Sequence, residues 1–396
     1  MLYTTLYPYV KKKDYTAFNW DILRSLIEMA NFLFVGLNNL FFYGKYYNSR
    51  RIYILVIITP YKFNKKQSVR QVFFLAWGNV NNTDLAIVYT VLLAYTKFGG
   101  AMKRQPLFSS MHIHTKFCDG RDDIETMCQA AYEKSLFAIG FSSHAPTDKQ
   151  LGSVNGWNMK SDLIDEYVKE VHAAKERWRG KLNVFLGLEV DYIKGKRSPL
   201  DSDIVKLNLD YIIGSVHYLF PENGAQGFTV DGSQEEFDTG LKDGFGGDAQ
   251  KLMHSYYDAV AEMIKMGGFD IIGHADLLKK NTLGKNLWSL EAEAERQKEI
   301  TNIAKKAKLV FEVNTGGINR NKIQETYPSL SFLKIIKKFN VPVTITADAH
   351  RARDVNGNYT IALNTLKEAG IKKHFIFKEK TNKKKSVWLK EIIINN

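Results

Sequence analysis

The sequence is organised around one short stretch, Met111-His112-Ile113-His114-Thr115-Lys116-Phe117-Cys118-Asp119-Gly120. Side chains of a β-strand alternate between its two faces, so His112 and His114 are expected on the same face. Two neutral imidazoles that point the same way at a strand end can bind one metal ion, and Asp119 follows closely enough to add an oxygen ligand. A single His-x-His pair is weak evidence. The placing of the other histidines therefore decides the interpretation.

Apolar runs and helical periodicity alternate from residue 107 onward. The predicted strands are the one that carries His112 and His114, then 136–141, 183–190, 211–216, 269–273, 309–314 and 341–347. Predicted helices lie at 122–134, 161–178, 248–266, 290–306, after Pro328 and at 360–369, with a glycine-rich loop at 219–247 and a last strand at 375–377. This alternation is typical of a parallel sheet covered by helices. About seven such units favour a closed β/α barrel over an open doubly wound sheet.

Polar residues follow these strands one after another. They are His112, His114, His144, Glu189, His217, His274, Asp348 and His350. The carboxyl ends of barrel strands meet at one mouth, so these side chains are expected to converge. Nitrogen and oxygen ligands without a certain thiolate suit Zn, Mn or Fe. The set is too large for one ion, and Glu189 is the obvious bridge between two.

Composition is that of a folded protein, with 45% hydrophobic and 24% charged residues in 396. Only two cysteines, Cys118 and Cys128, are present, so no disulfide framework supports the fold and a reducing, cytoplasmic setting is expected. The net charge of +13 divides into +8 for residues 1–101 and +5 for the remainder. That mild excess beyond residue 101 suits an anionic small substrate as well as a polynucleotide. No Gly-x-Gly-x-x-Gly or Walker-type loop indicates a nucleotide cofactor.

Residues 1–101 differ from the rest and contain no histidine. Their apolar stretches, 31–43, 52–60 and 85–95, are shorter than the roughly 20 residues of a membrane-spanning helix. No clean secretory signal is present. Met102-Lys103-Arg104 resembles a translation start, so residues 1–101 are expected to be an over-extended gene model or a poorly ordered appendage, with a small membrane-associating or partner-binding segment as the alternative. The main domain is expected to span 102–396, without membrane association.

Several motifs occur in a fixed order over about 270 residues. They are His112-Ile-His114 with Phe117-Cys-Asp-Gly120, Gly140-Phe-Ser-Ser-His144-Ala-Pro146, Gly187-Leu-Glu-Val-Asp-Tyr192, Asp210-Tyr-Ile-Ile-Gly-Ser-Val-His217-Tyr218, Ile272-Gly-His-Ala-Asp276, Val313-Asn-Thr-Gly-Gly317 and Ala347-Asp-Ala-His350. From about residue 107 to 380 the chain thereby resembles the polymerase-and-histidinol-phosphatase (PHP) family. The Gly-Ser-Val-His-Tyr and Asn-Thr-Gly-Gly pieces are similar to its phosphatase branch rather than the polymerase-linked one.

The resemblance implies an α/β fold, a distorted barrel of seven strands with a trinuclear metal site at the strand ends. It implies a first metal on His112, His114, Glu189 and Asp348, and a second on Glu189, His217 and His274. His144 and His350 would hold a third ion. Many relatives supply a histidine after Phe-Cys for that ion, whereas this chain has Asp119 and Gly120 there, so Asp119 is predicted as the ligand.

The implied activity is hydrolysis of L-histidinol phosphate to L-histidinol and phosphate in histidine biosynthesis. Two or three divalent ions (Zn, Mn or Fe) would activate water and clamp phosphoryl oxygens, with Glu189, Asp348 and His217 as the catalytic residues. Arg320 and Arg197 are candidates for phosphate binding and Asn314 for a polar wall of the substrate site. Cys118 is expected to serve in packing, because no general base is spaced to activate it.

Two other functions stay open. Another PHP hydrolase could act on nucleotides or short oligonucleotides through the same metal site, although no platform of aromatic and basic residues stands out in 102–396. A non-catalytic protein with a structural or degenerate metal site is the second alternative. The expected partner is a small phosphomonoester, with no nucleic acid. The sequence does not indicate an oligomeric state.

Overall fold

The computed structural model describes residues 41–47, 50–64, 67–80, 83–93, 108–151, 156–378 and 388–394. The chain divides into two compact units, Met1–Arg104 and Gln105–Asn396. None of the described helices is long and apolar enough to cross a membrane.

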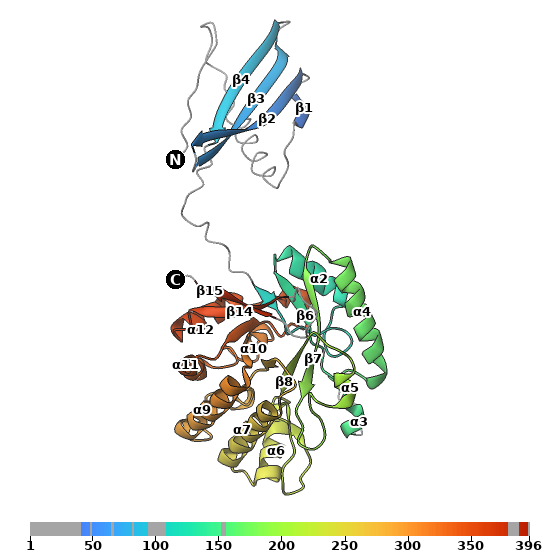
Figure 1. The fold of residues 1–396 in the computed structure, drawn as a ribbon, viewed down its shortest axis with the longest axis vertical. Coiled ribbons are helices and arrows are strands. Elements are labelled where there is room, and N and C mark those ends of the chain that lie inside the picture. The colour runs from blue at the N-terminus through green and yellow to red at the C-terminus, as the bar shows by residue number, and fades with distance from the viewer. Residues whose placement is uncertain are drawn as a thin grey trace. The chain divides into compact units, whose positions relative to one another are not determined.

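The first unit contains a four-stranded antiparallel sheet that was not predicted from the sequence. Its strands are β1 (Phe41–Tyr47), β2 (Arg50–Asn64), β3 (Gln67–Val80) and β4 (Thr83–Leu93), which pair in chain order (Figure 1). Consecutive strands are joined by short connections, and the β2–β3 register shifts once between Lys62 and Asn64. The apolar stretch 52–60 lies in β2 and most of 85–95 lies in β4. That residues 102–396 fold without residues 1–101 stays a prediction, which expression of 102–396 alone would test.

The second unit is built on seven parallel strands. They are β5 (Ser109–Ser110), β6 (Ala138–Phe141), β7 (Asn183–Asp191), β8 (Tyr211–Ser215), β11 (Ile271–Ile272), β12 (Val310–Asn314) and β13 (Val343–Thr346), paired in chain order. Ile113, beyond β5, forms a parallel bridge with Ala349, beyond β13. There the His114 amide donates to the Ala349 carbonyl at 2.9 Å. This bridge joins the first strand to the last, and the predicted seven-stranded barrel is confirmed.

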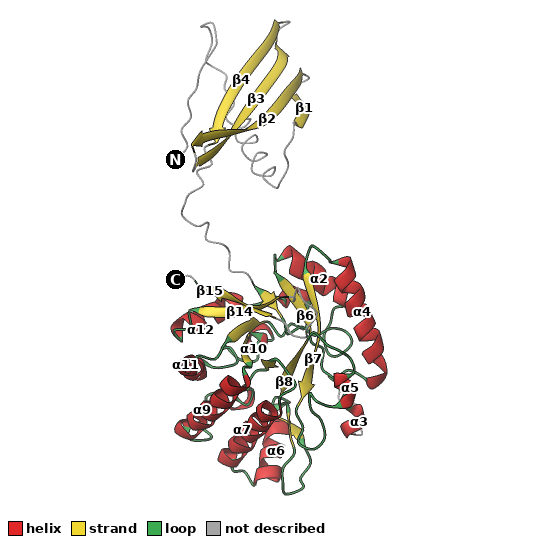
Figure 2. Ribbon diagram, in the orientation of Figure 1, coloured by secondary structure: helices red, strands yellow, loops and turns green. Residues whose placement is uncertain are grey.

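Helices surround the strands on the outside (Figure 2). The long ones are α2 (Ile124–Glu133), α4 (Ile164–Arg177), α6 (Gln234–Phe245), α7 (Ala249–Met266), α9 (Leu290–Ala307), α11 (Leu330–Phe339) and α12 (Tyr359–Glu368). Single turns are α3 (Asp148–Leu151), α5 (Ser202–Val205), α8 (Lys279–Thr282) and α10 (Gly316–Asn319). Side-chain caps start several of them, for example Asp123 at α2 and Ser289 at α9. The buried face of α2 is the predicted one, made by Ile124, Met127, Cys128 and Ala131.

The predicted loop at 219–247 is wrong. Its first part pairs β9 (Tyr218–Leu219) with β10 (Phe228–Thr229), and its second part is the helix α6 (Gln234–Phe245). Glycine has a low helix propensity, so Gly240 and Gly244 weaken the sequence signal for α6. Gly240 is needed for packing, because a Cβ there would lie 2.3 Å from the ring of Phe228.

One strand prediction also needs correction. The first barrel strand ends at Ser110, so the two histidines of the His-x-His pair follow it rather than lie within it. The last strand, predicted at 375–377, is confirmed as β14 (Lys373–Lys378), which pairs antiparallel with β15 (Trp388–Ile393) outside the barrel sheet.

The barrel interior is filled around Tyr211. Its hydroxyl donates to the carbonyl of Met111 at 2.6 Å, and its ring contacts Phe377 of β14 at 5.9 Å between centroids. A Cβ on Gly140 or Gly187 would lie 2.5 Å from Tyr211 atoms. Glycine in β6 and β7 therefore makes room for a phenol ring that fills the barrel beneath its mouth.

We expect Gly187→Ala to destabilise the protein by about 1–3 kcal/mol, because the added methyl overpacks the interior against a fixed ring. Denaturant unfolding of both proteins checks this. Gly156→Ala is the matched control, because nothing lies within 4 Å of a Cβ built at that exposed glycine. Equal stability of Gly187→Ala and the wild type would contradict the close packing around Tyr211.

Candidate metal centre

The first group of ligand-type side chains comes from the ends of β5, β7 and β13. His112 Nε2 lies 3.1 Å from Glu189 Oε2, and His114 Nε2 lies 3.5 Å from the same oxygen. His114 Nε2 also lies 3.2 Å from Asp348 Oδ1. The bridge between Ile113 and Ala349 holds these segments side by side, so His112, His114 and Asp348 converge from both sides of the barrel closure.

The other oxygen of Glu189 faces a second group. His274 Nε2 lies 2.9 Å and His217 Nε2 lies 3.7 Å from Glu189 Oε1, and the Ser215 hydroxyl donates to this oxygen at 2.6 Å. Glu189 therefore lies between two sets of imidazoles and presents one carboxylate oxygen to each. This is the arrangement of a bridging ligand.

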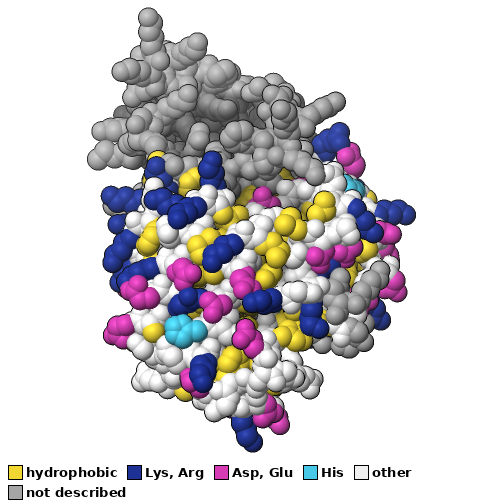
Figure 3. All heavy atoms as spheres, turned by 60° about the horizontal axis from the view of Figure 1, so that its bottom comes forward, with side chains coloured by type: hydrophobic (Ala, Val, Ile, Leu, Met, Phe, Trp, Pro, Cys, Tyr) yellow, Lys and Arg dark blue, Asp and Glu magenta, His cyan; other side chains and the backbone are white. Residues whose placement is uncertain are grey.

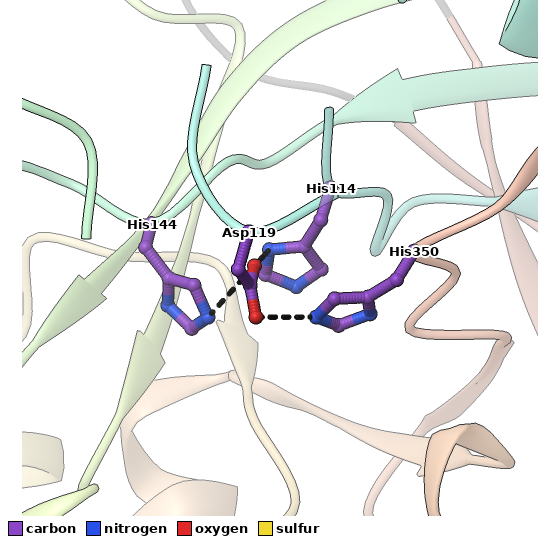
Figure 4. Close-up of side chains that lie close together, drawn as sticks. All are labelled: His114, Asp119, His144 and His350. Carbon is purple, nitrogen blue, oxygen red and sulfur yellow. Dashed lines mark hydrogen bonds and ion pairs between the residues drawn. The ribbon is translucent and has the colours of Figure 1, made fainter. Parts of the chain in front are cut away.

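The third group surrounds Asp119. His350 Nε2 lies 3.0 Å from Asp119 Oδ2, while His114 Nδ1 and His144 Nε2 lie 3.7 and 3.9 Å from Asp119 Oδ1. Figure 4 shows the three imidazole rings gathered about this one carboxylate. One ligand atom from each of the four residues lies within 4.8 Å of the others. Asp119 thus lies beside His144 and His350, the other two predicted ligands of the third ion.

Several atoms of these groups are buried without a hydrogen bond. They are His112 Nε2, His114 Nε2, His144 Nδ1, Glu189 Oε2 and Asp119 Oδ1. Leaving a buried polar atom unpaired costs about 1–3 kcal/mol, and more for a charged group. A concentration of such ligand-type atoms in one place fits divalent cations. Coordination would satisfy all of them together.

Two further carboxylates bind the Nδ1 atoms of imidazoles whose Nε2 atoms face Glu189. Glu312 of β12 accepts from His112 Nδ1 at 2.8 Å, and Asp191 at the end of β7 accepts from His217 Nδ1 at 2.8 Å. Glu312 also accepts from Thr346 and from the His274 amide. A carboxylate on one ring nitrogen fixes the tautomer and leaves the other nitrogen free to bind a metal.

Neither Glu312 nor Asp191 is among the predicted site residues. A signal for Glu312 is present in the sequence, because it is a lone acid within the apolar run 309–314. Asp191 stands two residues after Glu189, on the same side of the strand.

The electrostatics favour ionised carboxylates. Burial raises the pKa of Glu189, but His112, His144 and His217 outweigh it and hold that pKa well below its usual value. Burial lowers the pKa of His144 to about 3. Burial also lowers the pKa of His217, but Asp191 and Glu189 raise it to about 10. The centre thus holds negative charge that is only partly balanced by its histidines.

The three predicted substrate contacts have different outcomes. Arg320 lies beside the centre, where its guanidinium forms two parallel bonds of 3.1 and 3.0 Å to Asp348. Arg197 does not line the pocket: its side chain is buried elsewhere and paired with Asp201 and Asp203. That prediction is corrected, because two acids in the next few residues neutralise the arginine within its own loop.

Asn314 is also not a pocket wall. Its amide donates to Glu312 at 2.9 Å and Asp348 at 3.3 Å, so it positions two acids of the centre instead. Cys118 lies 3.5 Å from His114 Nδ1, and burial raises its pKa to about 11, with Asp119 adding to the shift. A protonated thiol agrees with the predicted packing role.

A pocket of about 240 Å³ opens over the centre. Its floor carries Asp119, Glu189, Asp348 and the histidines 144, 217, 274 and 350. Its walls carry the cations Lys280, Arg320 and Lys322, the acid Asp231, and the aromatic residues Trp157 and Tyr327. Trp157 stacks on Tyr218 with 5.2 Å between ring centroids and packs edge-on against His144. The pocket thus joins a candidate metal floor to a cationic and aromatic wall.

Curated relatives align with most of their length. The chain is 28% identical over 260 residues to a Deinococcus radiodurans protein named "Probable histidinol-phosphatase", covering 65% of this chain and 92% of the relative. It is 24% identical over 265 residues to the histidinol-phosphatase of Bacillus subtilis (strain 168), covering 63% and 95%.

A solved structure shares the fold. It is a Listeria monocytogenes protein assigned as a histidinol phosphatase, matched with a TM-score of 0.56 at 24% identity over 64% of this chain and 98% of that one. The model of the PHP domain family matches residues 110–316, just over half of the chain, and includes the strand ends from His112 to Asn314. The chain therefore belongs to the PHP domain family.

Proposed function

We propose that this protein is a metal-dependent phosphatase that hydrolyses L-histidinol phosphate to L-histidinol and phosphate. The observation that carries the proposal is the buried Glu189 carboxylate, with imidazoles on both of its oxygens and unpaired ligand atoms around it. The curated relatives described above, named as histidinol-phosphatases, support the choice of substrate.

Three cation sites are proposed from the three groups. The first would use His112, His114, Glu189 and Asp348, and the second would use Glu189, His217 and His274. The third would use Asp119, His144 and His350. Divalent cations bound there would supply an activated water and neutralise phosphoryl oxygens. Nitrogen and oxygen donors suit Zn, Mn or Fe, and two or three ions per chain are proposed.

The chain's own residues would orient the ester. Arg320, with Lys280 and Lys322, gives the pocket three cations that can hold the phosphate dianion. The Arg320 fork stays beside the centre because Asp348 binds both of its ends. Glu312 and Asp191 would keep His112 and His217 in the tautomer that presents Nε2 to the centre. No protein nucleophile is required in this scheme.

The alternative substrate, a nucleotide or oligonucleotide, has less support. The pocket of about 240 Å³ is below the usual range for ligands of drug size. Positive and negative side chains are interspersed over most of the described surface in view in Figure 3, without the continuous basic track that a polynucleotide needs. The many ligand atoms in one centre also speak against a degenerate, non-catalytic site.

The substrate is tested by phosphate release from L-histidinol phosphate and, separately, by cleavage of a single-stranded oligonucleotide, each with Mn or Zn added. We expect turnover of L-histidinol phosphate with a kcat/KM in the ordinary enzyme range of about 10⁴ M⁻¹s⁻¹ or more, and little cleavage of the oligonucleotide. Preference for the oligonucleotide would overturn the proposal.

Glu189→Gln should lower phosphatase activity by about 100-fold or more and reduce the metal content. Loss of groups that only support a ligand already costs about 10–100-fold, and Glu189 would contact the ions directly. Phosphate release and elemental analysis measure the two effects, and circular dichroism checks the fold. Glu176→Gln on α4, an exposed glutamate paired with Arg179, is the control. Wild-type turnover by Glu189→Gln would contradict the bridging role.

A further inference from the structure

The pocket wall contains one carboxylate that the candidate metal centre does not use. Four acids line the pocket, and Asp119, Glu189 and Asp348 belong to the ligand groups described above. The fourth is Asp231, whose side chain is 29% exposed. Asp231 therefore offers a negative charge to whatever occupies the pocket.

Asp231 is held in place by its neighbours in the chain. The Val230 amide donates to the His217 carbonyl at 2.8 Å, and the Asn281 side chain donates to the Val230 carbonyl at 3.0 Å. On the other side, Lys280 Nζ donates to the Gly232 carbonyl at 3.2 Å. The backbone on both sides of Asp231 is thus anchored to the segments that follow β8 and β11.

A side chain at the position after Asp231 would displace the side-chain contacts that hold this turn. A Cβ on Gly232 would lie 2.1 Å from a Glu236 carboxylate oxygen and 2.5 Å from the Thr229 hydroxyl. That Glu236 carboxylate accepts both the amide and the hydroxyl of Thr229 at 2.8 Å. The segment 219–247, which was expected to be a loop, therefore holds the Asp231 carboxylate at the pocket.

The fold itself satisfies Asp231 poorly. Its nearest cation among the described residues is Lys280, at 3.9 Å from Asp231 Oδ2, which is beyond hydrogen-bond distance. Lys280 points its ammonium at the Gly232 carbonyl instead. By contrast, each acid of the centre has an imidazole or guanidinium nitrogen within 3.1 Å.

The charges of the wall suggest how a substrate would divide between them. Arg320, Lys280 and Lys322 suit a phosphate dianion, and they leave Asp231 as the acid for a positive group on the same molecule. An ammonium group fits this place, because it stays charged at neutral pH, whereas a free imidazole is mostly neutral.

We propose that Asp231 is a specificity-determining residue that binds the ammonium group of an amino-alcohol phosphomonoester. This deepens the proposed function and rests on it, since L-histidinol phosphate carries such a group. A charge-assisted hydrogen bond from the ammonium group to Asp231 would favour aminated esters over otherwise identical esters without the amine.

The test compares two substrates that differ only in the amine: L-histidinol phosphate and 3-(imidazol-4-yl)propyl phosphate. Asp231→Asn should lower kcat/KM for the aminated ester about 10- to 100-fold and leave that of the other ester within about twofold. Asp238→Asn changes an exposed residue on α6, in the same segment between β8 and α7, and should leave kcat/KM for both esters unchanged. An equal fall for both esters would show that Asp231 acts only through Lys280, and no change for either would also overturn the proposal.

Binding of the product separates this inference from the proposed function. Calorimetry with L-histidinol and its deaminated analogue should show a preference for the amine in the wild type that Asp231→Asn loses. If that preference is present but L-histidinol phosphate is not hydrolysed, the proposed function fails and the role of Asp231 stands. If the ester is hydrolysed without a preference for the amine, the role of Asp231 fails alone.

Discussion

Burial of the Glu189 carboxylate is the constraint on which the site depends. Only 1% of this residue is exposed, and five imidazoles, those of His112, His114, His144, His217 and His274, approach its two oxygens. A charge removed from water must be compensated by partners at close range. The barrel supplies them by ending neighbouring parallel strands at one mouth, and the ligand-type atoms around Glu189 that form no hydrogen bond could bind cations.

Much of this could be predicted from the sequence. Histidines at strand ends are informative because the carboxyl ends of all barrel strands lie at one mouth. Residues that follow successive strands therefore lie side by side around that mouth. Carboxylates that orient a ligand histidine are harder to recognise. A buried acid such as Glu312 has the same local sequence whether it binds a ligand histidine or another residue. Arg197 shows the reverse error. Its neutralisation by Asp201 and Asp203 depends on side-chain directions in a loop, which the spacing of residues does not settle.

The segment between β8 and α7 shows how tertiary packing can override local propensity. Glycines at 240 and 244 weaken the helical signal of α6, yet Gly240 is what allows the helix to pack against Phe228. The same segment brings Asp231 to the wall of the pocket that opens over the candidate metal centre. Catalytic chemistry and substrate choice would then belong to different parts of the chain. The residues at the strand ends would act on the phosphate. The segment between β8 and α7 would select the alcohol through its ammonium group.

The most direct measurement of the central claim is phosphate release from L-histidinol phosphate by the full chain before and after removal of metal with a chelator. Elemental analysis of the same samples gives the ions per chain. The account predicts about two or more ions per chain in the active protein, loss of activity as they are removed, and recovery when Zn or Mn is returned. Full activity in protein with fewer than about one ion per chain would contradict it.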